Sequence, residues 1–370
     1  MLDQGTPGPN SPDIRYSGSL EATVKRIWTL VSGVVVLAAM ALIVLVAPTD
    51  FVSRSPGTAV DVTSQQGSPP VVVVSGATTI STQGRIMATA MAQSGPDGLV
   101  SLPDLIAGYL LPAYDVLPRG NVYPPGETVA EMAEEARLRV ESSREQAMAA
   151  AVKASQEVVV ERPKVLAVRQ LGPAYQLLFP GDLILEVDNT PVQTDADIRT
   201  YIRSNKQVGD QVVVTIMRGL SVSRVTIERL VGSSTDVTIP TIGVSQWGKG
   251  YSYTSSVQIA TDVDQGDPAQ GLALALATYG LLNSQDLTGG KTIAAAGQIT
   301  ADGAVGAVPG IDEHAMSAWN SQAAIFLMPR ANCSDLTATF ATMPVVPVSD
   351  LQQAIDALGN FRRGNTLPHC

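Results

Sequence analysis

The sequence has 370 residues, which is enough for two or three domains that each bury a core of their own. Its net charge of −10 and pI near 4.7 exclude the usual nucleic-acid partner, because phosphate binding needs clustered Lys and Arg. Hydrophobic residues make up 45% of the chain, and the mean hydropathy is +0.16, so we expect part of the chain to lie in a membrane.

Metal-ligating residues are few. The chain has two cysteines, Cys333 and Cys370, and two histidines, His314 and His369. A zinc site needs about four ligands at recognisable spacing, so we predict no metal and no cofactor. A disulfide between the two cysteines is a hypothesis that requires an extracytoplasmic location.

The N-terminal region is expected to anchor the protein. Residues 1–26 are polar and rich in Pro, Gly and Ser, which predicts a disordered cytoplasmic tail. Residues 27–47 are uncharged and apolar, and at about 1.5 Å per residue such a helix crosses a hydrocarbon core of about 30 Å. The alternative is a cleaved signal peptide, but its apolar core usually has about 7–15 residues. We therefore predict a retained transmembrane helix in contact with membrane lipid.

The flanking charges predict the orientation of this helix. Arg15, Lys25 and Arg26 precede it, whereas only Arg54 follows closely. Because basic residues favour the cytoplasmic side, we expect a single-pass protein of the cell membrane with its N-terminus in the cytoplasm. The bulk of the chain is then extracytoplasmic.

Residues 48–157 are predicted to form a β-rich region followed by a long helix. Residues 71–74 are four valines that indicate a buried strand, and residues 128–155 have a helical pattern. Thr128 and Glu131 have the spacing of a capping box at its start. We interpret this helix as a surface or spacer helix that supports the next domain.

Residues 158–231 alternate short strands with one helix near residues 196–204. The series Gly-Pro-Ala, Pro-Gly-Asp-Leu-Ile, Val-Asp-Asn, Val-Gly-Asp and Ile-Met-Arg within this region resembles a PDZ domain. Asn189 stands where such domains often have Gly, and Asn tolerates the left-handed backbone of that turn. The resemblance implies peptide binding by strand addition beside Val165, Leu166, Ala167 and Val168. The alternative is a spacer domain whose groove is unused.

Residues 235–358 alternate strands and helices, and residues 359–370 are expected to be a tail. Motifs at residues 257–260, 266–272, 286–290, 293–306, 309–311 and 324–329 resemble the proteolytic domain of Lon-type peptidases. The whole of residues 27–358 is similar to bacterial proteins with one membrane helix, a PDZ domain and a Lon-like domain. The expected fold class is therefore multidomain α+β, with a single N-terminal transmembrane helix.

The resemblance also implies the positions of a catalytic dyad. The family's turn Gly-Pro-Ser-Ala-Gly corresponds to residues 267–271 here, which places Ala269 at the nucleophile position. His314 falls where the family has its Lys general base. A Ser–Lys dyad works because a desolvated Lys takes the Ser proton, so Ala269 leaves nothing to deprotonate. Proteolysis by this mechanism is not expected.

Three other features of this region have alternative interpretations. Residues 289–292, Gly-Gly-Lys-Thr, echo a phosphate loop, but Gln285 stands where that motif needs Gly, so nucleotide binding is not predicted. Nearby hydroxyls offer replacement nucleophiles: Ser255, Ser256, Thr261 and Ser284. Carboxylates offer a pocket for a cation or basic peptide, although surface carboxylates at loop ends are the favoured interpretation: Asp262, Asp264, Asp267, Asp312 and Glu313.

The sequence thus predicts a membrane-anchored, extracytoplasmic pseudopeptidase that binds proteins or peptides, or regulates proteolysis. One alternative is an active Lon-family serine endopeptidase of protein quality control with an unrecognised nucleophile. Another is a structural surface protein with a blocked PDZ groove. A homo-oligomer or a partner peptidase is implied by the resemblance alone.

Overall fold

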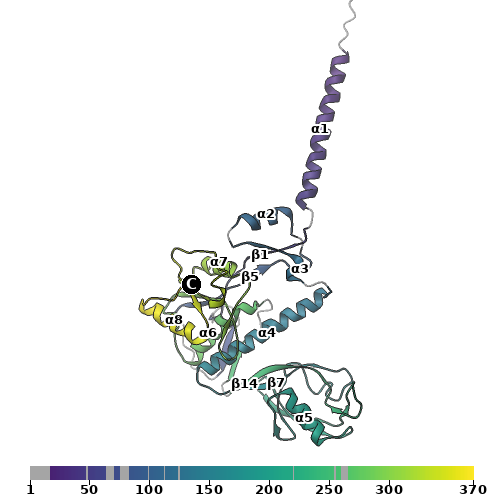
Figure 1. The fold of residues 1–370 in the computed structure, drawn as a ribbon, viewed down its shortest axis with the longest axis vertical. Coiled ribbons are helices and arrows are strands. Elements are labelled where there is room, and N and C mark those ends of the chain that lie inside the picture. Colours follow the sequence, from purple (N-terminus) through teal and green to yellow (C-terminus); the bar gives the residue numbers. More distant parts are fainter. Residues whose placement is uncertain are drawn as a thin grey trace, which may run out of the picture.

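A computed structural model describes residues 17–46, 49–63, 71–75, 83–98, 100–111, 113–123, 126–219, 221–253, 256–259 and 266–370. Helix α1 (Ser17–Val46) extends away from the rest of the protein (Figure 1). Its segment Arg26–Leu45 is long and apolar enough to be a membrane span or a signal sequence. The helix predicted at residues 27–47 is therefore present, and its apolar side chains are exposed.

A small antiparallel sheet lies at the base of α1 (Figure 1). Its strands are β1 (Phe51–Pro56), β5 (Met91–Gln93) and β6 (Asp115–Pro118), in the order β5-β1-β6. Two short helices, α2 (Leu102–Leu110) and α3 (Arg119–Val122), flank it. The chain from Thr49 onward thus belongs to a folded unit.

The long helix α4 (Val129–Ala154) begins with the predicted capping box. The Glu131 backbone N–H donates to Thr128 Oγ1 at 3.2 Å, and the Thr128 N–H donates to the Glu131 carboxylate at 2.8 Å. The interpretation as a surface spacer is wrong for its second half, where Ala147 and Ala150 are buried in a core with helix α6 (Gly271–Leu282). Small alanine side chains let the two helices approach closely.

The middle region forms one antiparallel sheet with strand order β11-β10-β8-β7-β14. Asp188 and Asn189 both have positive φ, 46° and 64°, which confirms the left-handed turn expected at Asn189. Helix α5 covers the core of this sheet, to which it contributes Ile198 and Ile202. The elements are β7 (Val159–Val168), β8 (Leu183–Val187), β9 (Thr190–Pro191), α5 (Asp195–Asn205), β10 (Val212–Arg218), β11 (Ser221–Ile227) and β14 (Val244–Tyr253), with a ladder of β12 (Val231–Gly232) and β13 (Pro240–Thr241).

The C-terminal region is built on a second sheet with order β2-β4-β16-β19-β20, whose last four strands are parallel. Alternate residues of β16 point to opposite faces, as strand geometry requires. Ile293 packs in the core with α6 and α8, whereas Ala294 packs with α7 on the other face. The bounds are β2 (Val60–Asp61), β4 (Arg85–Ala88), β16 (Thr292–Ala295), α7 (Ile311–Asn320), β19 (Ile325–Pro329), β20 (Val345–Val348) and α8 (Leu351–Arg363).

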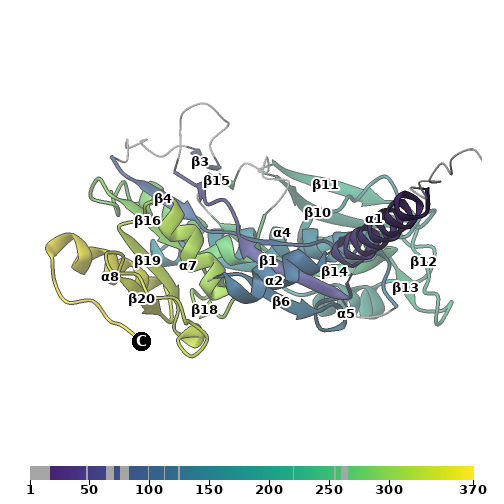
Figure 2. The same ribbon diagram turned by 90° about the horizontal axis from the view of Figure 1, so that it is seen from above.

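Segments from before the middle region complete this C-terminal fold. Strand β4 pairs with β16, and β3 (Val72–Ser75) pairs with β15 (Ser256–Ile259). A short ladder of β17 (Gln298–Ile299) and β18 (Val305–Gly306) and the 3-10 turns η1 (Pro268–Gln270) and η2 (Arg330–Asn332) complete the elements. Figure 2 shows β4, β16 and β19 side by side, with α7 across them. The domain boundaries drawn from the sequence remain predictions.

The end of the chain is tied to the C-terminal core. Helix α8 runs to Arg363, beyond the predicted residue 358. Cys333 and Cys370 form a disulfide with a Cα–Cα distance of 5.4 Å, as hypothesised. Residues 365–370 are therefore held at both ends.

Candidate functional site

The turn before α6 is capped by its own aspartate. The Ala269 N–H donates to Asp267 Oδ1 at 2.9 Å, and Pro268 occupies the first position of η1, where no N–H is needed. Helix α4 supports the turn from behind, because Ser143 Oγ donates to the Pro268 carbonyl at 2.8 Å. A Cβ at Gly271 would lie 2.9 Å from Ser143 Oγ, so Gly is needed for this close approach.

The backbone N–H groups of this turn are used within the chain. Besides Ala269, the Gln270 N–H donates to the Asp267 carbonyl, and the Leu272 N–H to the Gly297 carbonyl, both at 2.9 Å. Free N–H groups at a helix N-terminus are what would stabilise an oxyanion. Ala269 is itself buried and has no nucleophilic atom. The turn therefore has the position of an oxyanion site but lacks its free donors.

His314 lies beside this turn and is completely buried. It comes from α7, which begins after Gly310 in the left-handed conformation with φ 67°. Its Nδ1 lies 3.0 Å from Thr89 Oγ1, and its Nε2 lies 3.6 Å from Asp267 Oδ2. Ala269 and the α7 residues Ile311 and Ala315 belong to one buried cluster. The structure thus brings the two dyad positions expected from the sequence to one place.

Burial and the neighbouring Asp267 carboxylate act on the pKa of His314 in opposite directions. Burial lowers this pKa, and the carboxylate raises it. Thr89 Oγ1 has one proton and two acceptors within reach, His314 Nδ1 at 3.0 Å and the Ala295 carbonyl at 3.3 Å, so its role towards the ring depends on the tautomer of His314. His314 Nε2 faces the Asp267 carboxylate at 3.6 Å without forming a hydrogen bond. Thr89, His314 and Asp267 therefore lie side by side where β4, α7 and the turn meet.

Of the predicted acidic residues that the structure describes, Asp267 lies beside His314. Asp312 Oδ1 accepts hydrogen bonds from the N–H groups of Thr337 and Ala338 at 2.8 and 2.9 Å. Glu313 is buried, and this burial raises the pKa of its carboxyl. Asp262 and Asp264 lie outside the described residues. Within the part of the chain that the structure describes, no three His, Cys, Asp or Glu side chains could together hold a metal ion.

The hydroxyls proposed as replacement nucleophiles are not placed at the turn. Ser284 follows the end of α6, whose length separates it from Ala269 by about 18 Å at 1.5 Å per residue. Ser255, Thr261 and the side chain of Ser256 lie outside the described residues. The hydroxyl that does face His314 belongs to Thr89, which is 225 residues away in the sequence. No sequence pattern signals it, because only the pairing of β4 with β16 brings it there.

The strand expected to bind peptides is already paired along its length. In β7, Val165 is opposite Trp247, Ala167 opposite Gln246 and Val168 opposite Val244, all in β14. Leu166 lies in the same paired stretch. Strand β14 stands at the end of the sheet, and its other edge has no strand beside it among the described residues. Helix α5 lies next to β13, which precedes β14 in the chain.

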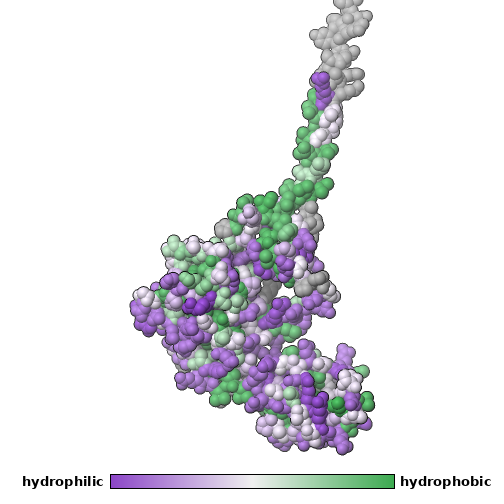
Figure 3. Space-filling model, viewed as in Figure 1, coloured by the Kyte–Doolittle hydropathy of each residue, from purple (hydrophilic) through white to green (hydrophobic). Residues whose placement is uncertain are grey.

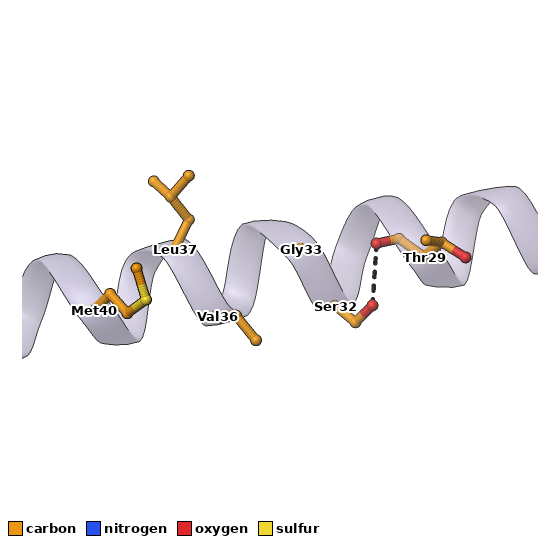
Figure 4. A pocket seen from close by; sticks show the side chains of 6 residues that line it. All are labelled: Thr29, Ser32, Gly33, Val36, Leu37 and Met40. Atoms are coloured by element: carbon orange, nitrogen blue, oxygen red, sulfur yellow. Dashed lines mark hydrogen bonds between the residues drawn. The ribbon is translucent and has the colours of Figure 1, made fainter.

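A surface hollow on α1 does not add a second candidate site. It lies over Gly33 and is lined by residues of this helix alone (Figure 4). Ser32 Oγ there donates to the Thr29 carbonyl at 3.0 Å, within the helix. The hollow contains no titratable group.

The fold combines an apolar N-terminal helix, an antiparallel sheet covered by α5 and an α/β domain in which the turn before α6 is capped. Residues 138–228 match the PDZ domain family, and residues 258–358 match the Lon protease (S16) C-terminal proteolytic domain. The chain therefore contains a PDZ domain and a Lon-type proteolytic domain and is a Lon-like, peptidase-related protein. No curated protein matches the chain.

Two solved structures similar to this chain are PDZ domains. One is from an SdrC-like protein of Listeria innocua, with 31% identity over 22% of this chain and 90% of that one and a TM-score of 0.21. Another is from an SdrC-like protein of Listeria monocytogenes, with 25% identity over 28% of this chain and 94% of that one and a TM-score of 0.20.

Proposed function

We propose that this protein is a membrane-anchored, extracytoplasmic pseudopeptidase that binds protein chains or regulates a partner peptidase. The observation that carries the proposal is the state of the turn at Ala269. Residues 267–271 themselves carry no hydroxyl, and the Ser143 hydroxyl beside the turn donates to the Pro268 carbonyl. The Ala269 N–H that would bind an oxyanion is held by the Asp267 carboxylate at 2.9 Å. The turn therefore lacks both the nucleophile and the oxyanion stabilisation on which acyl transfer depends.

His314 supports the same conclusion from the opposite side of the site. A general base must reach the proton that it removes, within hydrogen-bond distance or through one water. His314 is completely buried and is occupied by Thr89 at 3.0 Å. We propose that it serves the packing of α7 against the turn, in the position where the family has its catalytic Lys.

Restoring the chemistry stepwise tests this proposal. We expect the wild-type protein and the A269S/H314K variant to form no covalent adduct with a fluorophosphonate probe, since Asp267 still caps the turn. Adding Asp267→Gly should release the N–H and permit an adduct at residue 269, seen by mass spectrometry. A thermal unfolding curve for each variant controls for folding. Cleavage of an unfolded protein by the wild type, lost on changing one of its residues, would overturn the proposal.

The second candidate, an active peptidase, is favoured by one contact. Thr89 Oγ1, His314 and Asp267 stand in the order of a nucleophile, a base and an orienting carboxylate. Thr89 is completely buried, however, so a substrate has no access to it in this structure. A probe adduct on wild-type protein that disappears in Thr89→Val would establish this candidate.

We propose that peptides bind the PDZ domain along the outer edge of β14. Strand addition needs unpaired backbone groups, and β7 has β14 on one side and β8 on the other. The structural alternative, a blocked groove, predicts no saturable binding when peptides ending in a free carboxylate are titrated onto the full chain.

The anchored, extracytoplasmic location is also a proposal. Arg15, Lys25 and Arg26, which precede the apolar run at residues 27–47, favour a cytoplasmic N-terminus. The disulfide between Cys333 and Cys370 supports an oxidising compartment for the C-terminal region. Protease added to cells with a sealed cell membrane but no outer barrier should digest the C-terminal region, and protection of this region until the cell membrane is lysed would overturn this topology.

A further inference from the structure

Helix α2 presents an apolar face to the outside of the protein. Ile106, Tyr109 and Leu110 have i, i+3 and i+4 spacing, which places them on one side of the helix. Tyr109 is 89% exposed and Leu110 is 70% exposed, and α2 as a whole has no buried residue. Large apolar side chains gathered in this way on a protein surface mark an interaction site.

The opposite side of α2 is fixed by packing. Gly108 meets the side chain of Val116 in β6 so closely that a Cβ at this position would overlap it. The helix also contacts β1 of the same sheet. The direction in which Tyr109 and Leu110 point is therefore set by the fold and not by free rotation of the helix.

The position of this face relative to α1 is also fixed. The Thr49 N–H and Oγ1 both donate to the Val100 carbonyl, at 3.0 and 2.6 Å. Thr49 is three residues after the end of α1 at Val46, a span of at most about 10 Å. Val100 comes just before α2, which contacts α1. Figure 3 shows the apolar surface of α1 continuing onto α2.

We propose that α2 is a second membrane contact, which lies in the outer interfacial layer of the bilayer that α1 spans. This inference rests on the proposed anchoring by α1. An interfacial helix sinks about 5–10 Å into the headgroup region, a depth that the short connection from α1 to Thr49 permits. Tyr109 has the ring with one polar end that is enriched at this level of a membrane.

The chemistry of this contact is apolar and not electrostatic. Helix α2 contains no Lys or Arg, and its one charged residue is Asp104 in the first turn. Uncharged headgroups of the phosphatidylcholine type are therefore sufficient, and anionic lipids are not required. The two contacts, α1 and α2, hold the protein at a fixed tilt, with the PDZ domain at the end far from the bilayer (Figure 1).

Spin labels on the full chain in phosphatidylcholine vesicles test the proposal. Single cysteines are introduced as Leu37→Cys in α1, Tyr109→Cys in α2 and Val237→Cys in a distant exposed loop, each with the native cysteines bonded to each other. Collision with O₂ reports lipid, and collision with a nickel chelate reports water. We expect the ratio of O₂ to nickel accessibility at 37 and 109 to be several-fold higher than at 237.

The other possible outcomes distinguish a failure of this inference from a failure of the proposed anchoring by α1. A label at 37 in lipid with one at 109 in water would overturn the α2 contact and leave the anchor intact. A label at 37 in water would overturn the anchor itself. Shielding of 109 from both reagents would overturn the inference in favour of a protein partner, such as a second copy of the chain.

A charged residue introduced into the apolar face of α2 serves as the matched variant. We expect Leu110→Asp to move the label at 109 into water while the label at 37 stays in lipid. Raising the salt concentration should leave 109 in lipid, because salt screens charges and not apolar contacts. Release of 109 by salt would contradict an apolar contact and overturn the proposal.

Discussion

In both the Lon-type domain and the PDZ domain, a segment of the protein itself occupies the place where a bound peptide is expected. The consequences are opposite in the two domains. In the Lon-type domain, the Asp267 side chain caps the N–H of Ala269, two residues further on, and the site is closed. In the PDZ domain, β14 pairs with β7 and presents a new edge. The Asp267 carboxylate accepts the hydrogen bond of the Ala269 N–H, which is then unavailable to a ligand. The added strand β14, in contrast, gives the sheet a new edge with backbone groups that a peptide can pair with. Under the proposed function, the PDZ domain can therefore bind peptides although the Lon-type domain performs no chemistry.

The largest expected effect is a loss of stability in the Lon-type domain that leaves the PDZ domain unchanged. Replacing both Cys333 and Cys370 by Ser should lower the free energy of unfolding of the Lon-type domain by about 3 kcal/mol. The PDZ core shares no residue with the clusters of the Lon-type domain and should be unaffected. Hydrogen exchange of peptides from α8 and α5 measures both. Equal losses in the two helices would show that the domains unfold as one unit.

A second variant breaks the joint between the domains. Lys164 Nζ in β7 lies 2.5 Å from Glu141 and 2.7 Å from Glu145 in α4, and its side chain is buried. Burial raises the pKa of Glu145, and Lys164 opposes this effect. Lys164→Met would leave the half-buried Glu145 carboxylate unpaired, at a cost of about 2 kcal/mol in a denaturant unfolding curve.

Lys249 in the neighbouring strand β14 provides the control for this variant. It pairs with Glu161 at 2.8 Å, but its side chain is 74% exposed. Because exposed ion pairs contribute little, Lys249→Met should change the free energy of unfolding by less than about 0.5 kcal/mol. Similar effects of the two substitutions would mean that Lys164 does not join the domains.

The closed site also predicts a dependence of stability on pH. Burial lowers the pKa of His314 in the folded protein, with Asp267 acting in the opposite direction, so below pH 6.5 the unfolded state binds the proton more readily. The contribution of His314 is thus fully present above its unfolded pKa and is lost as the pH falls from 6.5 towards the lowered value. The slope is at most about 1.4 kcal/mol per pH unit.

His314→Gln should remove this part of the pH dependence, measured as the difference between the unfolding free energies of variant and wild type from pH 7.5 to 5. A parallel slope in both proteins would show that the buried imidazole is not the group that titrates.

The smallest expected effect concerns the open edge. A peptide added to β14 should slow hydrogen exchange of residues 244–250, where it takes up backbone groups, and leave residues 221–227 of β11 unchanged. Protection of β11 alone would place peptide binding at the other end of the sheet.

Much of the architecture was predictable because its signals are local. The apolar run that forms α1, the Thr128 capping box and the Asn189 turn each depend on a few neighbouring residues, and each is confirmed. The PDZ and Lon-type regions were recognisable for the same reason, since their turns need particular residues at particular spacing. The proposed dyad positions, Ala269 and His314, were likewise marked by short motifs.

Only the tertiary structure decided how these parts are completed. Thr89 reaches His314 because β4 pairs with β16, and β14 covers β7 because a strand from beyond the PDZ motifs returns to its sheet. The alanines in the second half of α4, a helix interpreted from the sequence as a surface spacer, are buried because α6 offers a matching surface. A sequence determines short-range backbone preferences directly. Pairings between distant segments depend on the free energy of the whole packed core, which no local pattern contains.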